Sequence, residues 1–459
     1  MEQRSVHFVG IGGIGMSAMA RILLARGERV SGSDSATSPL IERLRSEGAV
    51  ITVGHAAANT DHAASLVVSS AIDMQNPEYL AAQERGIPIF SRGQMLARLM
   101  EEQRGIAICG THGKTTTTAM TACVLRGGGI DASLVLGGIA IDTGTNAHQG
   151  SAPWFLTEAD ESDGSFALLD PAIAVLGNIE NDHLESDAEL PKLVASFEGF
   201  LERLPADGLA IVGIDNPNTA SLAARKRQAH TLTFGFSEAA DVRPRNVTYV
   251  NLGSDFEVFE GQENLGSVHL RVPGRINVEN AVAAVCVGRA LQIPFARIAE
   301  ALHDFSGVRR RFDIVARSER LTVVDDYAHH PTAIRATIDA AKQYHRGPIV
   351  VAFQPHRYSR TAYLARDFAD ALQGADCIYL TPIYAASEKP IDGISERSIG
   401  EPLARLNPNV RYVPAVEDLP ELLLRDAPAG ALILFLGAGS ITHVAARLGR
   451  ELSSSAMRA

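Results

Sequence analysis

One stretch of the chain, residues 106–118, constrains the fold more than any other. It begins with an apolar run, turns at Gly110 and passes a single lysine, Lys114, into four threonines. This order is typical of a β-strand that leads through a tight turn into the N-terminus of a helix. Backbone N–H groups and the helix dipole at such a turn face an anion, most often a phosphate. The stretch therefore predicts an α/β domain with a phosphate-binding loop.

The loop is predicted to hold the phosphates of a nucleotide. The lysine would reach the β- and γ-phosphates, and the hydroxyl of Thr115 would ligate Mg²⁺. The pattern is shorter than the full triphosphate loop, because Ile108 stands where a first glycine is expected. An ordinary strand–helix turn is the alternative. The predicted nucleotide-binding residues are Gly110, Thr111, His112, Gly113, Lys114, Thr115 and Thr116.

Length and composition limit the possible functions. A chain of 459 residues is too long for one core and predicts two to four domains. A net charge of −11 argues against a nucleic acid or an anionic membrane as partner. No apolar run reaches about 18 residues and the N-terminus lacks a signal pattern, so we expect a cytoplasmic protein without membrane insertion. The four cysteines lie in separate apolar runs, which is typical of buried free thiols.

A second glycine-rich turn lies near the start of the chain. Its glycines follow an apolar strand with the spacing of a dinucleotide fingerprint, and Asp34 ends the next strand. An NAD-dependent oxidoreductase uses this motif, but a UDP-sugar offers the same diphosphate and ribose. Arg92, at the end of a later strand, either pairs with a phosphate or is a surface arginine. The predicted diphosphate-binding residues of the turn are Gly12, Gly13, Gly15 and Asp34.

Two acidic strand ends follow the phosphate loop. Glu158 opens a run of four acids in residues 158–163, directly after an apolar strand, and His183 closes a polar run after the strand predicted at 173–179. An α/β sheet places ligands at these ends, and Mg²⁺ prefers oxygen ligands. We expect Thr115, Glu158 and His183 to ligate metal. The sequence does not show which of Asp160, Glu161 and Asp163 take part and which only orient the ligands. A solvated loop and a structural histidine are the alternatives.

The second half of the chain carries three further polar groups. After a β-rich stretch at 231–272, Asn277 and Asn280 precede an alanine-rich helix, where they would read an adenine edge or cap the helix. The strand from Leu321 ends in Asp325–His330, and the strand at 348–353 ends in Gln354–Arg360. The arginines of the last group suit bidentate binding of a carboxylate or phosphate. The glycines at 437 and 439 are attributed to strand–helix packing.

Several motifs, taken in order, resemble the Mur ligase family. They are Gly-Thr-His-Gly-Lys-Thr (110–115), Glu-Ala-Asp-Glu-Ser-Asp (158–163), Asn-Asp-His (181–183), Asp-Asp-Tyr-Ala-His-His-Pro (325–331) and Phe-Gln-Pro-His-Arg-Tyr (353–358). The resemblance implies an α/β fold with three domains: a Rossmann-like UDP-binding domain (1–103), a central P-loop-type ATPase domain (104–308) and a C-terminal Rossmann-like domain (309–459). It does not settle the oligomeric state.

The resemblance also implies a reaction. ATP would phosphorylate the carboxylate of UDP-N-acetylmuramate, and L-alanine would attack the acyl phosphate, in peptidoglycan precursor synthesis. A tripeptide-recycling relative is the alternative. By resemblance, Lys114, His183, His356 and Arg357 would be catalytic, with Arg360 and Tyr327 also near the alanine. Asn277, Asn280 and Asp326 would bind ATP, and Asn146 and Arg92 the UDP-sugar. Two departures are Ile276, where relatives carry histidine, and Lys192, in an unlike context for a carbamate-modified lysine.

Overall fold

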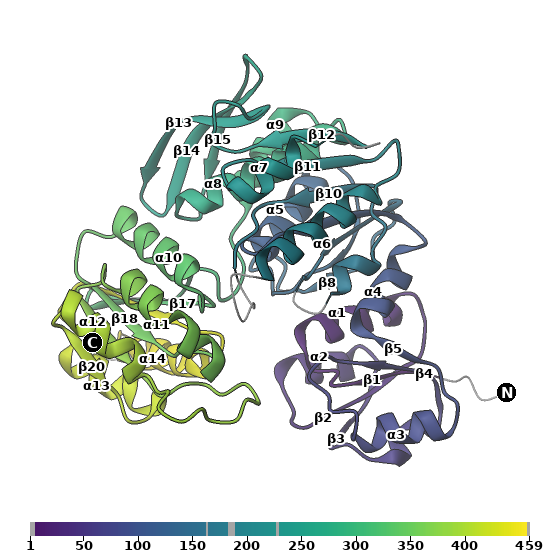
Figure 1. Ribbon diagram of the computed structural model, residues 1–459, viewed down its shortest axis with the longest axis horizontal. Helices are drawn as coiled ribbons and strands as arrows, with labels where there is room; N and C mark the ends of the chain where they lie inside the picture. The colour runs from purple at the N-terminus through teal and green to yellow at the C-terminus, as the bar shows by residue number, and fades with distance from the viewer. Residues whose placement is uncertain (1–4, 162–163, 182–188, 226–228, 457–459) are drawn as a thin grey trace.

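The chain folds into three lobes, each built around its own β-sheet (Figure 1). The computed structural model describes residues 5–161, 164–181, 189–225 and 229–456. His183 and Asp163, which the sequence placed near a metal, lie outside the described residues. In Figure 1 the N-terminal lobe is purple, the central lobe teal and the C-terminal lobe green to yellow.

The N-terminal lobe has a five-stranded parallel sheet in the order β3-β2-β1-β4-β5. This is the order of a Rossmann half with its switch point beside β1, where the glycine turn follows. The first helix begins at Ile14, directly after this turn. The elements are β1 (Ser5–Val9), α1 (Ile14–Ala25), β2 (Val30–Asp34), α2 (Pro39–Ser46), β3 (Val50–Val53), β4 (Ala63–Val68), α3 (Pro77–Glu84), β5 (Ile89–Ser91) and α4 (Arg92–Met100).

The central lobe has a ten-stranded sheet in the order β15-β14-β13-β12-β11-β10-β6-β9-β7-β8. Strands β12 to β7 of this order are parallel, and the β-rich stretch predicted at 231–272 is confirmed as β12 and an antiparallel extension. The elements are β6 (Arg104–Cys109), α5 (Lys114–Gly127), β7 (Ser133–Val135), β8 (Ala147–His148), β9 (Trp154–Glu158), β10 (Ile173–Leu176), α6 (Leu190–Glu202), β11 (Leu209–Gly213), α7 (Pro217–Ala223), β12 (His230–Phe234), β13 (Val242–Val250), β14 (Gly253–Glu260), β15 (Glu263–Leu270), α8 (Arg275–Ala290) and α9 (Phe295–Asp304).

The C-terminal lobe has a six-stranded sheet in the order β16-β17-β21-β18-β19-β20, parallel except for β16. Its strands read as continuous apolar runs because helices cover both faces. The elements are β16 (Asp313–Arg317), β17 (Leu321–Asp326), α10 (Pro331–Tyr344), β18 (Ile349–Phe353), α11 (Tyr358–Leu372), β19 (Cys377–Leu380), α12 (Arg397–Leu406), β20 (Val410–Tyr412), α13 (Leu419–Asp426), β21 (Ala431–Leu436) and α14 (Ile441–Ala456).

The N-terminal and central lobes share one apolar cluster. Phe8 and Met19 of the first lobe belong to the same cluster as Phe155 and Phe197 of the central lobe, whereas the C-terminal sheet has its own core on each face. The C-terminal lobe meets the central lobe through α10, which contacts α8 and β13. The first two lobes are thus joined by apolar packing, and the described part of the C-terminal lobe contributes no residue to the cluster they share.

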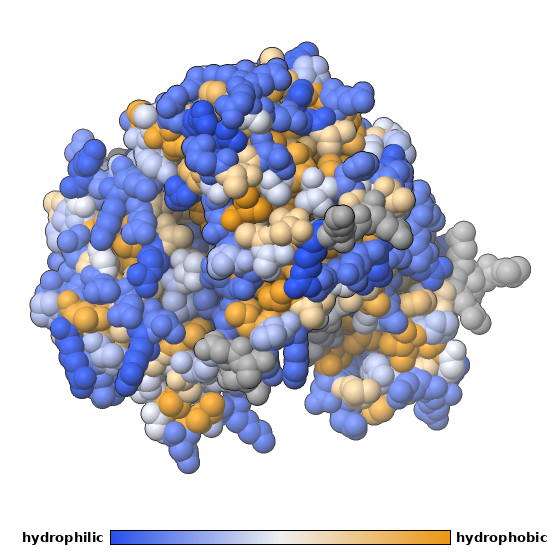
Figure 2. Space-filling model, turned by 45° about the horizontal axis from the view of Figure 1, so that its top comes forward, coloured by the Kyte–Doolittle hydropathy of each residue, from blue (hydrophilic) through white to orange (hydrophobic). Residues whose placement is uncertain are grey.

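The visible surface is largely hydrophilic, with hydrophobic residues in separate patches (Figure 2). Among the helices that the structure describes, none is both long and apolar enough to span a lipid bilayer.

Candidate functional site

A cavity of about 560 Å³ lies where the three lobes meet. The central lobe contributes the phosphate loop and the start of α8, the C-terminal lobe contributes the end of β17 and the start of α10, and the N-terminal lobe contributes Gly15 and Arg92. The predicted site residues that line the cavity are Gly15, Arg92, Thr111, His112, Gly113, Lys114, Thr115, Thr116, Glu158, Asn277, Asn280, Asp326 and Tyr327.

The phosphate loop is fixed to the end of the neighbouring strand β10. Thr111 N donates to the carbonyl of Asn178 at 2.9 Å, and His112 N donates to its side-chain oxygen at 2.8 Å. Gly110 has φ +122°, and a Cβ there would lie 2.8 Å from the Asn178 carbonyl. Gly113, the N-cap of α5, has φ +84°, and its Cβ would lie 2.6 Å from Asn280 Oδ1. Both glycines are required by the close approach of these neighbours.

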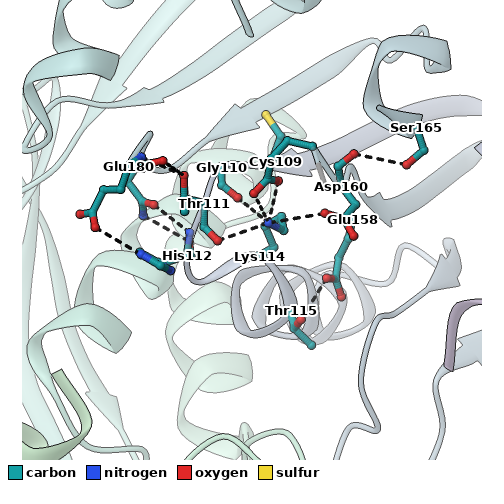
Figure 3. A network of polar contacts seen from close by, with 12 residues as sticks. Cys109, Gly110, Thr111, His112, Lys114, Thr115, Glu158, Asp160, Ser165 and Glu180 are labelled. Carbon is teal, nitrogen blue, oxygen red and sulfur yellow. Dashed lines mark hydrogen bonds and ion pairs between the residues drawn. The ribbon is translucent and has the colours of Figure 1, made fainter. Parts of the chain in front are cut away.

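Lys114 lies at the centre of a polar network (Figure 3). Its Nζ donates to the carbonyls of Gly110 at 2.7 Å and Thr111 at 3.3 Å, and to the two carboxylate oxygens of Glu161 at 2.7 and 3.0 Å. Burial disfavours its charge, but the carboxylates of Glu161 and Asp160 outweigh this effect and raise the pKa of Lys114. The lysine is therefore held as a cation beside the cavity.

Thr115, in the first turn of α5, and Glu158, at the end of β9, form a second polar group. Thr115 Oγ1 donates to Glu158 Oε2 at 2.9 Å, and Gly137 N donates to Glu158 Oε1 at 2.5 Å. Arg311 lies 3.4 Å from Thr115 Oγ1. Burial raises the pKa of Glu158, partly offset by these hydrogen bonds. A carboxylate and a hydroxyl this close offer the oxygen ligands that Mg²⁺ requires, so the residues fit the predicted metal.

Asn277 and Asn280 lie in the first turns of α8, whose N-cap is Gly274. The capping alternative for the two asparagines is therefore wrong, because the helix begins at Arg275, before both of them. Asn280 is buried, accepts from Thr117 Oγ1 at 3.1 Å and donates to Asn277 Oδ1 at 3.2 Å. Asn277 donates to the Pro273 carbonyl at 2.7 Å. The pair thus links α8 to α5 directly behind the phosphate loop.

The end of β17 faces the cavity through Asp326 and Tyr327. The two carboxylate oxygens of Asp326 accept from the backbone N–H groups of Phe312 and Ala328, each at 2.7 Å. Arg310 and Arg311 lie over the Tyr327 ring, 4.7 and 5.0 Å from its centroid. Both arginines come from the connection between α9 and β16. No pattern in the sequence indicated that they would reach the cavity.

A further group joins the central and C-terminal lobes. His112 Nε2 lies 3.3 Å from Glu180 Oε2, and Thr332 Oγ1 donates to the same carboxylate oxygen at 2.7 Å. The ring of His330 lies 5.2 Å from the ring of His112. Ligand atoms of His112, Glu180 and His330 all lie within 4.8 Å of one another, so these residues could also hold a metal. The sequence indicated polar residues at the strand ends, but it did not indicate that Glu180 contacts both His112 and Thr332.

Three predicted amino-acid-binding residues lie outside the lining of the cavity, at the start of α11. A chain of ring contacts connects them to it: Tyr327 to His329 at 5.1 Å, His329 to His356 at 5.6 Å, and His356 to Tyr384 at 5.7 Å. Arg357 has φ +69°, a strained conformation for a side-chain-bearing residue, and its N–H donates to the Tyr384 carbonyl at 2.8 Å. The three residues are His356, Arg357 and Arg360.

The glycine turn of the N-terminal lobe is closed by its own acid. Gly12 N donates to Asp34 Oδ2 at 2.9 Å, and a Cβ on Gly12 would lie 2.9 Å from the same oxygen. Gly13 is the N-cap of α1. Arg92 Nη2 lies 3.6 Å from Asp160 Oδ2, and a Cβ on Gly15 would lie 3.3 Å from Arg92 Nη1, so the arginine lies between this turn and the acidic strand end of the central lobe.

Asn146 is buried between two lobes rather than in the cavity. Its Nδ2 donates to the Ile14 carbonyl at 2.8 Å and to Ser17 Oγ at 3.0 Å, and its Oδ1 accepts from Arg21 at 3.1 Å. All three partners belong to α1, the helix that follows the glycine turn. Asn146 therefore positions this turn against the central lobe.

The cysteines follow the expectation of free thiols. Cys109, Cys123 and Cys286 are buried, and Cys377 is half-buried. Cys109 Sγ donates to the Val175 carbonyl at 3.1 Å, and burial raises the pKa of this thiol. Its position next to the phosphate loop therefore does not make it reactive.

Three family models match consecutive parts of the chain. They are described as "Mur ligase family, catalytic domain" (residues 5–104), "Mur ligase middle domain" (108–288) and "Mur ligase, glutamate ligase domain" (310–439). The chain belongs to the Mur ligase family. The family resemblance and the three-domain α/β fold expected from the sequence are thus confirmed, whereas the exact domain boundaries stay predictions.

This Mur ligase is similar along its whole length to curated proteins. It is 46% identical to the UDP-N-acetylmuramate–L-alanine ligase of Acidithiobacillus ferrooxidans, over 97% of each chain. It is 43% identical to the protein of the same name from Desulforamulus reducens, over 98% of this chain and 97% of the relative. The crystal structure of the Thermotoga maritima UDP-N-acetylmuramate–alanine ligase MurC superposes with a TM-score of 0.84 at 30% identity, over 98% of this Mur ligase and 100% of that chain.

Proposed function

We propose that this Mur ligase joins L-alanine to the carboxylate of UDP-N-acetylmuramate with hydrolysis of ATP, in the synthesis of the peptidoglycan precursor. The observation that carries the proposal is a cavity lined by all three lobes, with the phosphate loop in its lining. Three substrates must meet for this reaction, and each lobe supplies one wall. The names of full-length relatives at 43 and 46% identity support the same activity.

The reaction proceeds in two steps. The terminal phosphate of ATP passes to the substrate carboxylate, which gives ADP and an acyl phosphate. The uncharged amine of L-alanine then attacks the acyl carbon, the C–O bond to phosphate breaks, and the amine loses a proton. Negatively charged oxygens of the phosphates and of the substrate carboxylate lie close together in the transition state. Fixed cations beside them therefore lower the activation barrier for phosphoryl transfer. Lys114, with its raised pKa, supplies one such charge, and Arg311 beside Thr115 supplies a second.

Mg²⁺ is the proposed cofactor, with Thr115 and Glu158 as ligands from the described residues. When bound, it neutralises phosphate charge. The 2.9 Å hydrogen bond between the two side chains brings both oxygens to one point at the edge of the cavity. His183 stays a predicted third ligand, on sequence grounds alone.

The remaining roles are those that the family resemblance implies. Asn277 and Asn280 would bind the adenine, and Asp326 would lie on the ATP side; all three line the cavity, which supports these roles. Tyr327, His356, Arg357 and Arg360 would bind L-alanine, and the ring contacts from Tyr327 through His329 to His356 support a common subsite. The turn of Gly12, Gly13, Gly15 and Asp34, with Arg92, would bind the UDP-sugar, and Asn146 would hold this turn in place.

The test is substrate-dependent release of ADP and phosphate. We expect release only when UDP-N-acetylmuramate, L-alanine and Mg²⁺ are all present, with weaker activity on glycine or L-serine. Turnover with a murein tripeptide but not with L-alanine would instead assign the chain to the recycling type. Release that needs neither substrate would overturn the ligase assignment. NADH binding, followed by fluorescence, addresses the oxidoreductase alternative raised by the glycine turn.

A further inference from the structure

Among the described acids of the strand-end cluster (Glu158, Asp160 and Glu161), Glu161 hydrogen-bonds to the phosphate-loop lysine. Its two oxygens lie 2.7 and 3.0 Å from Lys114 Nζ, and its side chain is only 4% exposed. Asp160, next to it, lies 4.0 Å from the same nitrogen and is 36% exposed. The sequence alone does not distinguish the two acids, whereas their distances to Nζ and their exposure do.

The ammonium group of Lys114 is fully used by its present partners. It has three N–H bonds, and four acceptor atoms lie within hydrogen-bond distance of it. A phosphate oxygen can bind the same nitrogen only if one of these acceptors gives up its hydrogen bond.

The two backbone acceptors are poorly placed to move. They belong to Gly110 and Thr111, and the loop is fastened to Asn178 through both Thr111 N and His112 N. Glu161 reaches Lys114 with a side chain from another segment, beyond the end of β9. Its carboxylate also presents two anionic oxygens to the ammonium group, as a phosphate does.

We propose that Glu161 is an internal competitor of the nucleotide: its carboxylate occupies Lys114 while the loop is empty, and a phosphate oxygen takes over at least one of its hydrogen bonds on binding. Glu161 acts through Lys114 and is a positioning residue. The inference rests on the proposed nucleotide site. The proposal predicts the sign of the change in nucleotide affinity. If Glu161 competes with the nucleotide for Lys114, loss of its charge tightens nucleotide binding; if Glu161 only holds Lys114 in position, the same loss weakens it.

The experiment measures binding of ADP without Mg²⁺ by calorimetry. Glutamine keeps the shape of the side chain and loses its charge, so Glu161→Gln should lower the dissociation constant of ADP about tenfold. Asp160→Asn is the matched control. It removes the same charge from the adjacent residue, and its longer distance to Nζ should limit the change to about twofold. Circular dichroism verifies that both variants are folded.

Weaker or unchanged ADP binding by folded Glu161→Gln would overturn the inference, and so would an equal gain in Asp160→Asn, which would indicate a general charge effect. If Glu161→Gln does not fold, a crystal structure of the wild-type enzyme with ADP decides. We expect a phosphate oxygen on Nζ in place of at least one Glu161 oxygen. Retention of both Glu161 hydrogen bonds beside a bound phosphate would refute the exchange.

Lys114→Ala separates this inference from the proposed function. If that variant binds ADP as tightly as the wild type, the proposed nucleotide site itself is wrong. If Lys114→Ala weakens binding and Glu161→Gln weakens it too, the nucleotide site stands and only the competitor role fails.

Discussion

Thr332, in the first turn of α10, donates a 2.7 Å hydrogen bond to Glu180, at the end of β10, and so joins the C-terminal lobe to the central lobe. The same carboxylate oxygen lies 3.3 Å from His112 of the phosphate loop. Burial opposes ionisation of Glu180, but its contacts with His112 and Thr332 outweigh this and lower its pKa. Glu180 is thus an ionised link between the loop that would hold ATP and the lobe that would bind L-alanine.

Thr332→Val should loosen this link. The variant keeps the shape of the side chain but removes one hydrogen bond to a charged group, worth about 1–3 kcal/mol. We expect hydrogen exchange in the first turn of α10 to be about tenfold faster, as measured by mass spectrometry. Thr337→Val is the control, since Thr337 Oγ1 donates to the Ala333 carbonyl within the same helix. Equal exchange in the two variants would show that the Glu180 contact does not hold the lobes together.

Lys114→Ala should abolish turnover for a reason separable from folding. Loss of one preorganised cation from phosphoryl transfer costs on the order of a thousandfold in kcat. The substitution also leaves Glu161 buried without its partner, which destabilises the fold by several kcal/mol. The double variant Lys114→Ala/Glu161→Gln should recover the melting temperature but not kcat. A loss of less than about tenfold in kcat would contradict the phosphate role of Lys114.

Glu158→Gln should raise the requirement for Mg²⁺. Glutamine can still accept the hydrogen bond from Thr115, but a neutral amide is a much weaker ligand for a hard cation. We expect the Mg²⁺ concentration for half-maximal activity to rise at least about tenfold, in steady-state assays across a Mg²⁺ series. Asp142→Asn is the control, because Asp142 pairs with Arg126 on the same lobe and is absent from the cavity lining. An unchanged Mg²⁺ curve for Glu158→Gln would remove Glu158 from the metal site.

Local patterns sufficed for the parts of the fold and site that lie within one strand–turn–helix unit. Residues 106–118 form β6, the glycine turn and the start of α5, because an apolar run that ends at Gly110 permits few other structures. The lining of the cavity by Lys114, Thr115 and Glu158 follows, since parallel strands end at one edge of a sheet. The sequence alone therefore indicated that these three residues lie at one site.

The contacts between lobes could not be predicted in this way. Thr332 and Glu180 are 152 positions apart, and Arg311 and Thr115 are 196 apart, so each contact depends on how whole sheets dock. Asn146 illustrates the same limit. The family resemblance implies that Asn146 contacts the UDP-sugar, whereas the hydrogen bonds described above join its side chain to α1. No spacing of residues in the chain indicates this contact with α1.

Glu78, in the N-terminal lobe, should make the enzyme sensitive to acid. Its side chain is completely buried, and Ser33 Oγ donates to it at 2.6 Å. Burial raises its pKa, but the nearby imidazole of His7, whose Nε2 lies 3.8 Å away, and the hydrogen bonds from Ser33 and Asn59 outweigh this effect and lower the pKa to about 2. Because the folded-state pKa lies below the ordinary value of 4.5, ionised Glu78 contributes stability above that pH, and the contribution is lost as the pH falls toward 2.

Glu78→Gln tests this contribution. In the wild type the free energy of unfolding, from urea titrations followed by circular dichroism, should fall by up to about 3 kcal/mol between pH 5 and pH 2 through Glu78 alone. The variant should be less stable than the wild type at neutral pH and should have a shallower slope over this range. Glu84→Gln, on the exposed face of the same helix, should retain the wild-type slope. Parallel slopes for wild type and Glu78→Gln would mean that Glu78 is not the group whose protonation destabilises the N-terminal lobe.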